Sequence, residues 1–203
     1  MALLFAKNNS LSAVTALPAS ISGGGALNLI STQTASSSST IDFTSGIDST
    51  YKEYIFKIYN AHASDGDTNL QFNASVDGGS NYNVSHTASF FTSRHNESDS
   101  IARVQYETGR DAAESTGFQK LNYDTGNDND ENVCVTLHLF DPSSTVFTKH
   151  FLANGIDSGR AGGGSQSSFI AGYFNDTSAV NAIQFKFGAG NIDSGTFKLY
   201  GVS

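Results

Sequence analysis

The sequence predicts an all-β protein: an antiparallel β-sandwich, jelly-roll-like, that follows an extended N-terminal arm. One observation behind this prediction is that short stretches of alternating apolar and polar side chains fill most of the chain, as in half-buried strands. Another is that charged residues make up only 15% of the chain, while Ser, Thr, Asn and Gly hold most polar positions. Because these residues disfavour helices and suit strands and turns, we expect no substantial helix.

Residues 1–26 are predicted to form a separate anchoring arm. Their apolar side chains follow no steady period, and the segment closes on three glycines at 23–25, which act as a flexible hinge. So many apolar groups are unfavourable in water, and we therefore expect the arm to bury them on a partner. The predicted anchoring side chains are Leu3, Leu4, Phe5, Leu11, Val14, Leu17 and Ile21.

Residues 27–203 are predicted to form the β-sandwich domain, with about ten to twelve strands. Strands are expected at residues 26–31, 40–44, 51–60, 68–76, 83–94, 101–107, 117–123, 132–140, 145–153, 167–174, 182–188 and 196–202. Half-polar alternating strands imply antiparallel sheets with one solvated face. Two such sheets bury their apolar faces by packing on each other, which gives the sandwich.

Two of these stretches define which side chains should face the core. At 51–60, Tyr54, Phe56 and Ile58 share one face of the expected strand. At 68–76 the alternation is the clearest in the chain, with apolar residues at even positions and polar residues at odd positions. We expect the polar set to point away from the apolar face.

The connections are read from turn-forming residues. The Ser- and Thr-rich stretch at 32–39 is predicted to be a low-complexity link, and the Asp-Gly-Gly-Ser sequence at 77–80 a hairpin-type turn. No convincing helix is expected, and residues 109–115 could supply one short helical turn at most. Such connections fit a sheet protein with short strands.

An Ile-Asp-Ser sequence recurs three times, with its aspartate at Asp48, Asp157 and Asp193. We interpret each as a turn in which the carboxylate accepts backbone N–H groups, rather than as a metal or sugar site. The acid-rich stretch at 124–132 superficially resembles a calcium loop. An EF-hand loop starting at Asp124 needs Gly and Glu where this chain has Asn129 and Val135, so we expect a solvated hairpin loop.

No motif declares a catalytic activity. The chain lacks the nucleophile elbow, the zinc-binding His pair and the phosphate loop, and the glycine-rich stretch at 162–168 has no lysine. The protein is therefore predicted not to be an enzyme and to hold no cofactor or metal. A weaker alternative is a glycoside hydrolase using a pair from four acids close in sequence, Glu97, Asp99, Glu107 and Glu114.

Charge and hydropathy bound the partners. The net charge of −8 disfavours binding to a phosphate backbone, so no nucleic-acid partner is expected. No stretch approaches 18 consecutive apolar residues, and the start of the chain lacks the features of a signal peptide, so we expect no membrane insertion. The single Cys134 allows no intrachain disulfide and is expected to be a partly buried strand residue.

Three long stretches, residues 29–83, 137–151 and 169–203, together resemble small structural proteins of marine tailed bacteriophages, particularly those of cyanobacteria. The closing Ser-Gly-Thr-Phe-Lys-Leu-Tyr-Gly-Val-Ser is the most specific part. Proteins of this kind are described as tail-fibre-like or virion structural proteins. The resemblance implies a β-rich virion component and carries over no catalytic residues, while the residues before Gly23 lie outside it.

From this resemblance we expect an outward-facing tail-fibre or tail-appendage protein, assembled in the host cytoplasm and located in the virion. We expect its arm, residues 1–26, to attach it to other virion proteins and to anchor a homo-oligomer, a trimer by analogy with phage fibres. One alternative is a capsid decoration protein. Another is a module that binds host surface glycans, with Tyr59, Tyr106 and Tyr123 as candidate stacking groups.

Overall fold

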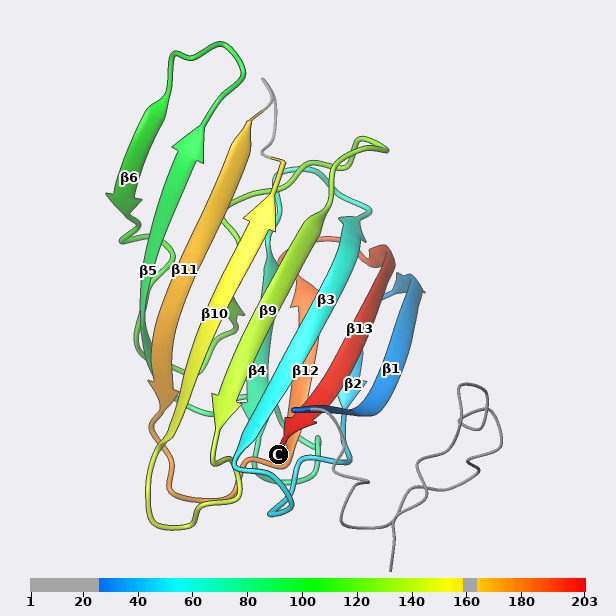
Figure 1. Ribbon diagram of the computed structural model, residues 1–203, viewed down its shortest axis with the longest axis vertical. Coiled ribbons are helices and arrows are strands. Elements are labelled where there is room, and N and C mark those ends of the chain that lie inside the picture. The colour runs from blue at the N-terminus through cyan, green and yellow to red at the C-terminus, as the bar shows by residue number, and fades with distance from the viewer. Residues whose placement is uncertain (1–25, 159–163) are drawn as a thin grey trace, which may run out of the picture.

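The computed structural model describes residues 26–158 and 164–203 of the 203-residue chain. Every helix or strand assigned among them is a strand, which confirms the all-β prediction. Two sheets, of nine and four strands, pack face to face as a sandwich (Figure 1). In chain order the strands are β1 (Leu27–Ser38), β2 (Ile41–Phe43), β3 (Glu53–Ala63), β4 (Leu70–Ser75), β5 (His86–His95), β6 (Ala102–Tyr106), β7 (Ala112–Ser115), β8 (Gln119–Lys120), β9 (Val133–Phe140), β10 (Lys149–Asp157), β11 (Ser165–Phe174), β12 (Ala182–Phe187) and β13 (Ile192–Val202).

The larger sheet has the strand order β1-β13-β3-β9-β10-β11-β5-β6, and β7 also pairs with β5. The smaller sheet has the order β2-β12-β4-β8. All these strand pairs are antiparallel, as the half-polar alternation predicts. In Figure 1 the larger sheet faces the viewer and the smaller sheet lies behind it, so one broad sheet face is left open.

Aromatic rings from both sheets form the centre of the core. Phe72 of β4 meets Phe151 of β10 edge to face, with ring centroids 5.2 Å apart. Phe185 of β12 meets Phe56 of β3 in the same manner at 5.4 Å. All four rings are buried, and these contacts set β4 over β10 and β12 over β3.

Period-two alternation predicts the inward side chains of the larger sheet well. Tyr54, Phe56 and Ile58 are buried as expected. In β9 and β10 buried and accessible residues alternate along almost the whole strand. At β6, by contrast, every residue is exposed, because this edge strand extends beyond the cover of the smaller sheet.

The prediction of a link at 32–39 is wrong, because most of this stretch belongs to β1. It pairs with β13 in continuous register from Ser31, opposite Leu199, to Ser38, opposite Ile192. Main-chain hydrogen bonds hold a strand whatever its side chains are, so a Ser- and Thr-rich sequence adds to the sheet once a partner strand is present. Ala35 of this stretch is buried in the core.

The hairpin prediction at 77–80 is also wrong. β4 belongs to the smaller sheet and β5 to the larger one, so the turn carries the chain between sheets. Gly78 and Gly79 take positive φ angles of 74° and 90°, which explains the glycine pair. The Asp77 carboxylate accepts hydrogen bonds from Ser75 and Asn81, which lowers the pKa of Asp77 to about 2.

The polar side of 68–76 is not solvated as its pattern suggests. Asn73 and Ser75 are fully buried. The side-chain amide of Asn73 donates to the backbone oxygens of Thr116 and Gly117, at 3.1 and 2.7 Å. The preceding residues 112–115, expected to supply at most one short helical turn, form strand β7. A loop folded over the outer side of β4 therefore buries polar groups that the local pattern assigns to water.

The predicted hinge at 23–25 and the predicted anchoring residues lie outside the described residues. These anchoring residues are Leu3, Leu4, Phe5, Leu11, Val14, Leu17 and Ile21. The arm and the jelly-roll connectivity both stay predictions. In the described part of the chain, no helix is long and apolar enough to cross a membrane.

Candidate functional site

The open side of the larger sheet carries a surface that we call the neutral face. It consists of the outward side chains of five neighbouring strands, β6, β5, β11, β10 and β9, whose register places them on one side. They are Ala102, Val104, Tyr106, Thr87, Ser89, Phe91, Ser93, His95, Ser165, Ser167, Phe169, Ala171, Tyr173, His150, Leu152, Asn154, Ile156, Cys134, Thr136, His138 and Phe140.

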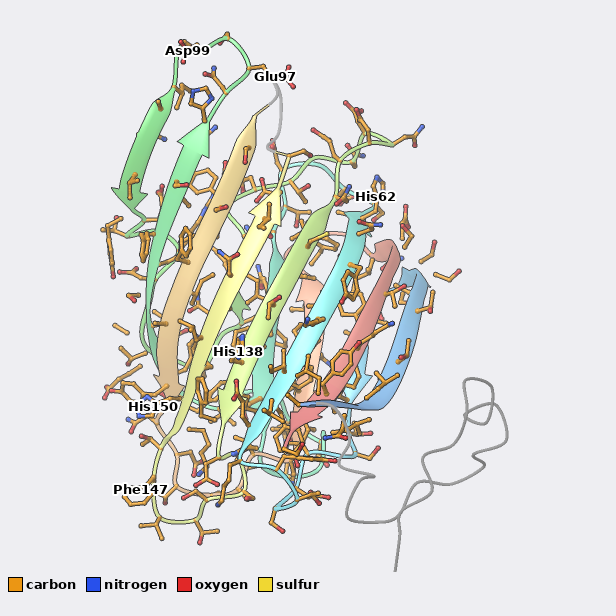
Figure 2. The ribbon with its side chains drawn as sticks, in the orientation of Figure 1. His62, Glu97, Asp99, His138, Phe147 and His150 are labelled. Carbon is orange, nitrogen blue, oxygen red and sulfur yellow. The ribbon has the colours of Figure 1, made fainter. Side chains whose placement is uncertain are left out.

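None of the side chains of the neutral face is Asp, Glu, Lys or Arg. The surface is continuous because side chains alternate between the two sides of each strand, so every second residue points outward. In these five strands the outward residues are all polar and uncharged, His, or apolar. His138 and His150, labelled in Figure 2, mark two of its strands. In a chain with a net charge of −8, five adjacent strands whose outward side chains include no carboxylate and no lysine form a distinct region.

An aromatic row crosses the neutral face. Tyr106, Phe91 and Phe169 are direct cross-strand partners on β6, β5 and β11. The rings of Phe91 and Phe169 stack with centroids 4.9 Å apart and an interplanar angle of 13°. The three residues are 50%, 41% and 38% exposed, so the row is accessible to a partner.

The remaining outward face, over β3, β13 and β1, is charged. Lys57 of β3 lies opposite Lys198 of β13. Glu53 of β3 pairs with His138 at the boundary with β9, with 2.6 Å between its Oε1 and the ring Nδ1. The open side of the sheet thus divides into a neutral part and a charged part.

The structure does not bring the three candidate stacking tyrosines together. Tyr59 lies on β3 in the charged part, with the Lys198 ammonium 5.9 Å from its ring centroid. Tyr106 lies in the aromatic row, and its hydroxyl donates to Asp111 at 2.9 Å, a bond that raises the pKa of Tyr106. Tyr106 and Tyr59 are separated by four intervening strands, which is about 24 Å at the usual strand spacing.

Tyr123 lies on the other side of the larger sheet. The guanidinium carbon of Arg110 is 3.7 Å from its ring centroid, and Arg94, which shares the inward register of Phe90, lies over the ring at 5.5 Å. Arg110 in turn pairs with Asp124 at 3.0 Å. The ring of Tyr123 therefore holds a charged cluster in place. Phe91 and Phe169, which sequence reasoning missed, accompany Tyr106 instead; only the strand register could reveal them.

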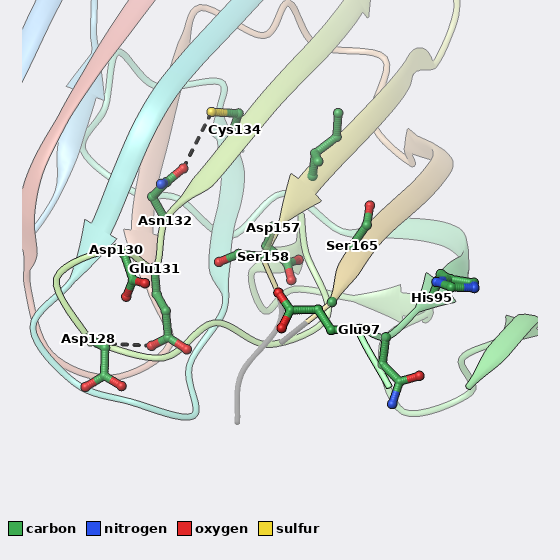
Figure 3. Close-up of a pocket in the computed structure, with 13 residues that line it drawn as sticks. His95, Glu97, Asp128, Asp130, Glu131, Asn132, Cys134, Asp157, Ser158 and Ser165 are labelled. Atoms are coloured by element: carbon green, nitrogen blue, oxygen red, sulfur yellow. Dashed lines mark hydrogen bonds between the residues drawn. The ribbon is translucent and has the colours of Figure 1, made fainter. Parts of the chain in front are cut away.

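The acid-rich stretch at 124–132 lies beside a cavity of about 1020 Å³ (Figure 3). The cavity is lined by Glu97, Asp128, Asp130, Glu131 and Asp157 together with neutral groups. Glu131 accepts the backbone N–H of Asp128 at 3.0 Å, as in a self-supported loop. In residues 26–158 and 164–203 no three His, Cys, Asp or Glu side chains are arranged to hold a metal ion. The stretch is a largely solvated loop as expected, but it joins β8 and β9 of different sheets and is no hairpin.

Only one of the three Ile-Asp-Ser sequences forms the predicted turn. The Asp48 carboxylate accepts the backbone N–H of Thr50 at 2.8 Å, and the hydrogen bonds from Thr50 lower the pKa of Asp48. Asp157 instead ends strand β10, where it is buried, and Asp193 lies within β13. The turn interpretation is therefore wrong for these two residues, because neighbouring strands pair with both segments.

The four acids considered for glycoside hydrolysis lie in different surroundings. Glu97 and Asp99 belong to the connection between β5 and β6, at one end of the molecule (Figure 2). Glu107 is buried and accepts a hydrogen bond from the Thr92 hydroxyl at 2.8 Å. Glu114 is on β7. The geometry gives no support to a pair of acids facing a common substrate.

Comparison of the chain with family models, with curated proteins and with solved structures finds no match. The neutral face and its aromatic row are therefore interpreted from their own chemistry.

Proposed function

We propose that the protein is a structural component of a tailed-phage virion, an outward-facing tail fibre or appendage anchored by residues 1–26. The observation from the structure that supports this proposal best is the neutral face, a broad open surface without Asp, Glu, Lys or Arg side chains. Interfaces between proteins are depleted of charged residues at their centre, whereas small-molecule and catalytic sites are concave. The sequence resemblance to phage structural proteins supports the same role.

The two edges of the larger sheet suggest which side of the protein attaches to the virion and which side stays exposed. The described chain starts at Ala26, whose backbone oxygen accepts the N–H of Ser203 at 3.4 Å beside strands β1 and β13. β1 is one edge of the sheet, and β6, at the border of the neutral face, is the other. An arm that joins the body beside β1 can bind another virion protein and leave the neutral face accessible.

Labelling of the virion tests this proposal. Immunogold labelling or a reconstruction of the particle should place the protein on the tail, whereas a position on the head shell would favour a capsid decoration protein. If the protein is found only in the cytosol of infected cells and never on particles, both versions are wrong.

Removal of the arm tests the anchor. Deletion of residues 1–22 should leave a folded β-domain that no longer joins particles, with circular dichroism as the control for folding. A version with the seven anchoring residues replaced by Ser retains the chain length and should fail in the same way. Incorporation of either variant at the wild-type level would show that the arm is not the anchor.

A second candidate function is binding of host surface glycans, which the exposed Tyr106 ring in the aromatic row favours. Apolar faces of sugars stack on aromatic rings, and neutral Ser, Thr and Asn groups suit sugar hydroxyls. A glycan array and a host-cell adsorption assay should then detect binding by the wild type that Tyr106→Ala lowers at least tenfold. Equal binding by both proteins, or none by the wild type, would contradict this role.

A further inference from the structure

We infer that the neutral face is a self-association surface, on which a second copy of this chain packs sheet to sheet. The contact is isologous: the same strands, β6, β5, β11 and β10, meet their counterparts in the second copy. This inference goes beyond the virion role and does not depend on it, since it concerns the sandwich alone. It is also separate from the arm, which the sequence predicts to anchor a homo-oligomer and to attach it to the virion.

The shape of the neutral face is complementary to that of the same face on a second copy. The stacked rings of Phe91 and Phe169 lie on adjacent strands, 4.9 Å apart, close to the spacing of the strands themselves. Nearly parallel rings at this spacing stand side by side and form a ridge two strands wide. We call this pair the ridge.

Small residues flank the ridge along the same two strands. One step along the strands on one side are Ser93 and Ser167, which are cross-strand partners; on the other side are Ala171 and Ser89. We call these two pairs the troughs. Larger side chains close the troughs on neighbouring strands, with Leu152 opposite Ala171. Alternating large and small rows are what two packed sheets need to interdigitate at about 10 Å.

Electrostatics favours binding of a second copy at the neutral face over binding at a charged part of the surface. Two molecules that each carry a net charge of −8 repel each other wherever acidic surfaces meet. The described side chains of the neutral face carry no carboxylate, lysine or arginine, so two copies can approach here without pairing like charges. An interface core is depleted of charge for the same reason.

The size of the face is sufficient. The four contact strands, at the usual spacing and up to ten residues in length, give a plane of at most about 20 by 30 Å. Because side chains make a real surface larger than its plane, this is close to the roughly 800 Å² that each partner contributes to a standard interface. The exposed large side chains there are Val104, Tyr106, Phe91, Phe169, Leu152 and Ile156.

A sugar ligand suits the ridge less well than a second sheet. The Phe91 and Phe169 rings cover each other, so each has lost one of the two faces on which a sugar ring stacks. A ridge also projects from the surface, whereas a ligand site is usually hollow. A trough in a second copy receives such a projection along its length.

The test measures the mass of the full-length protein by sedimentation velocity over a wide concentration range. The wild type should form an even-numbered assembly of the 21.4 kDa chain. Leu152→Glu, which places a charge beside a trough, should halve the mass of that assembly and raise the dissociation constant at least tenfold. Leu29→Glu is the matched control: Leu29 is 56% exposed on the same side of the sheet but in the charged part, against 50% for Leu152, and its variant should associate like the wild type.

Ala171→Trp separates ridge-and-trough packing from general stickiness. Ala171 is exposed, and a tryptophan there fills a trough while adding apolar surface. Packing of a ridge into that trough predicts weaker association, whereas nonspecific apolar contact predicts tighter association and would overturn the inference. Circular dichroism should be unchanged in all three variants.

Three further results would overturn the inference. They are a wild type that is monomeric at every concentration, an odd-numbered assembly, and an assembly that Leu29→Glu dissociates while Leu152→Glu does not. A monomeric wild type that binds host polysaccharide, and loses this binding in Leu152→Glu, would assign the face to a carbohydrate ligand instead.

Discussion

Phe151 and Phe169 lie on neighbouring strands of the same sheet but point to opposite sides of it. Phe151 of β10 is 2% exposed and touches the rings of Phe72 and Phe174. Phe169 of β11 is outward and stacks only on Phe91 among the described rings. The first ring holds two sheets together, while the second has no covering layer. The fold accounts for the inward phenylalanines and leaves the outward ones available for contact with a partner.

The largest expected difference compares these two rings directly. Phe151→Ala should lower the free energy of unfolding by about 3–5 kcal/mol, because it opens a cavity in the core. Phe169→Ala should lower it by about 1 kcal/mol or less, since its ring is largely solvated and its cross-strand pair contributes little. Urea unfolding of both variants measures the contrast. A loss of several kcal/mol in Phe169→Ala would mean that the outward ring belongs to the core.

Two consecutive residues of β10 make the same comparison for packing space. Gly155 faces the backbone of Leu121, with no room for a Cβ atom, whereas Ile156 points outward and is 49% exposed. Gly155→Ala should therefore destabilise the protein by about 1–3 kcal/mol through overpacking. Gly155→Ala adds a single methyl group and Ile156→Ala removes most of a side chain, yet Ile156→Ala should have the smaller effect on the midpoint of urea unfolding. The reverse order would contradict the assignment of inner and outer sides.

His86 extends the comparison to pH. It is buried on the inward side between β5 and the rings of Phe151 and Phe174, and this burial lowers its pKa below the usual 6.5. The unfolded chain then binds a proton that the folded chain does not. Stability should be complete above about pH 6.5 and should fall as the pH drops towards the pKa of the folded state.

His86→Gln removes this dependence and gives the control. The difference between the unfolding free energies of the wild type and the variant should be smaller at pH 5 than at pH 7, because the wild type loses stability as the pH falls from 7 to 5. Parallel pH profiles for the two proteins would show that His86 does not titrate differently in the folded state.

The smallest expected effect concerns the charged part of the outward face. Lys57 and Lys198 are direct cross-strand partners of like charge. Lys57→Thr should therefore raise the free energy of unfolding by a few tenths of a kcal/mol at low salt. The gain should vanish in high salt, where screening removes the repulsion. A salt-independent change, or altered self-association, would contradict the division of the face into two parts.

The local sequence pattern predicted the strands that alternate apolar and polar residues. It failed where contacts with neighbouring segments determine whether a stretch is a strand or whether a side chain is buried. The inward sets of β3, β9 and β10 follow from side-chain period alone. Ser- and Thr-rich residues of β1 gave no apolar signal, yet they form a strand because β13 lies beside them. The pattern predicts that Asn73 and Ser75 are solvated, yet both are buried: Asn73 binds a loop from distant sequence, and the Ser75 hydroxyl binds the adjacent Asp77.

The same limit applies to the candidate site. Tyr106 could be named from sequence as a candidate stacking group, and its side chain is exposed in the structure. Its neighbours could not, because Phe91 and Phe169 lie 15 and 63 positions away along the chain and meet it only through strand register. Tyr59 and Tyr123, chosen by residue type, lie in other surroundings.

The sequence by itself determined the all-β class, the sandwich and the inward faces of its main strands, because alternation with period two leaves one side apolar and that side must be buried. It also determined the low charge of the surface. Only the tertiary structure decided which strands are neighbours, and with them the ridge, the troughs and the division of the outward face. Strand order depends on contacts between distant segments. A period-two pattern shows to which side of its sheet each side chain points, but it does not show which strand lies beside it.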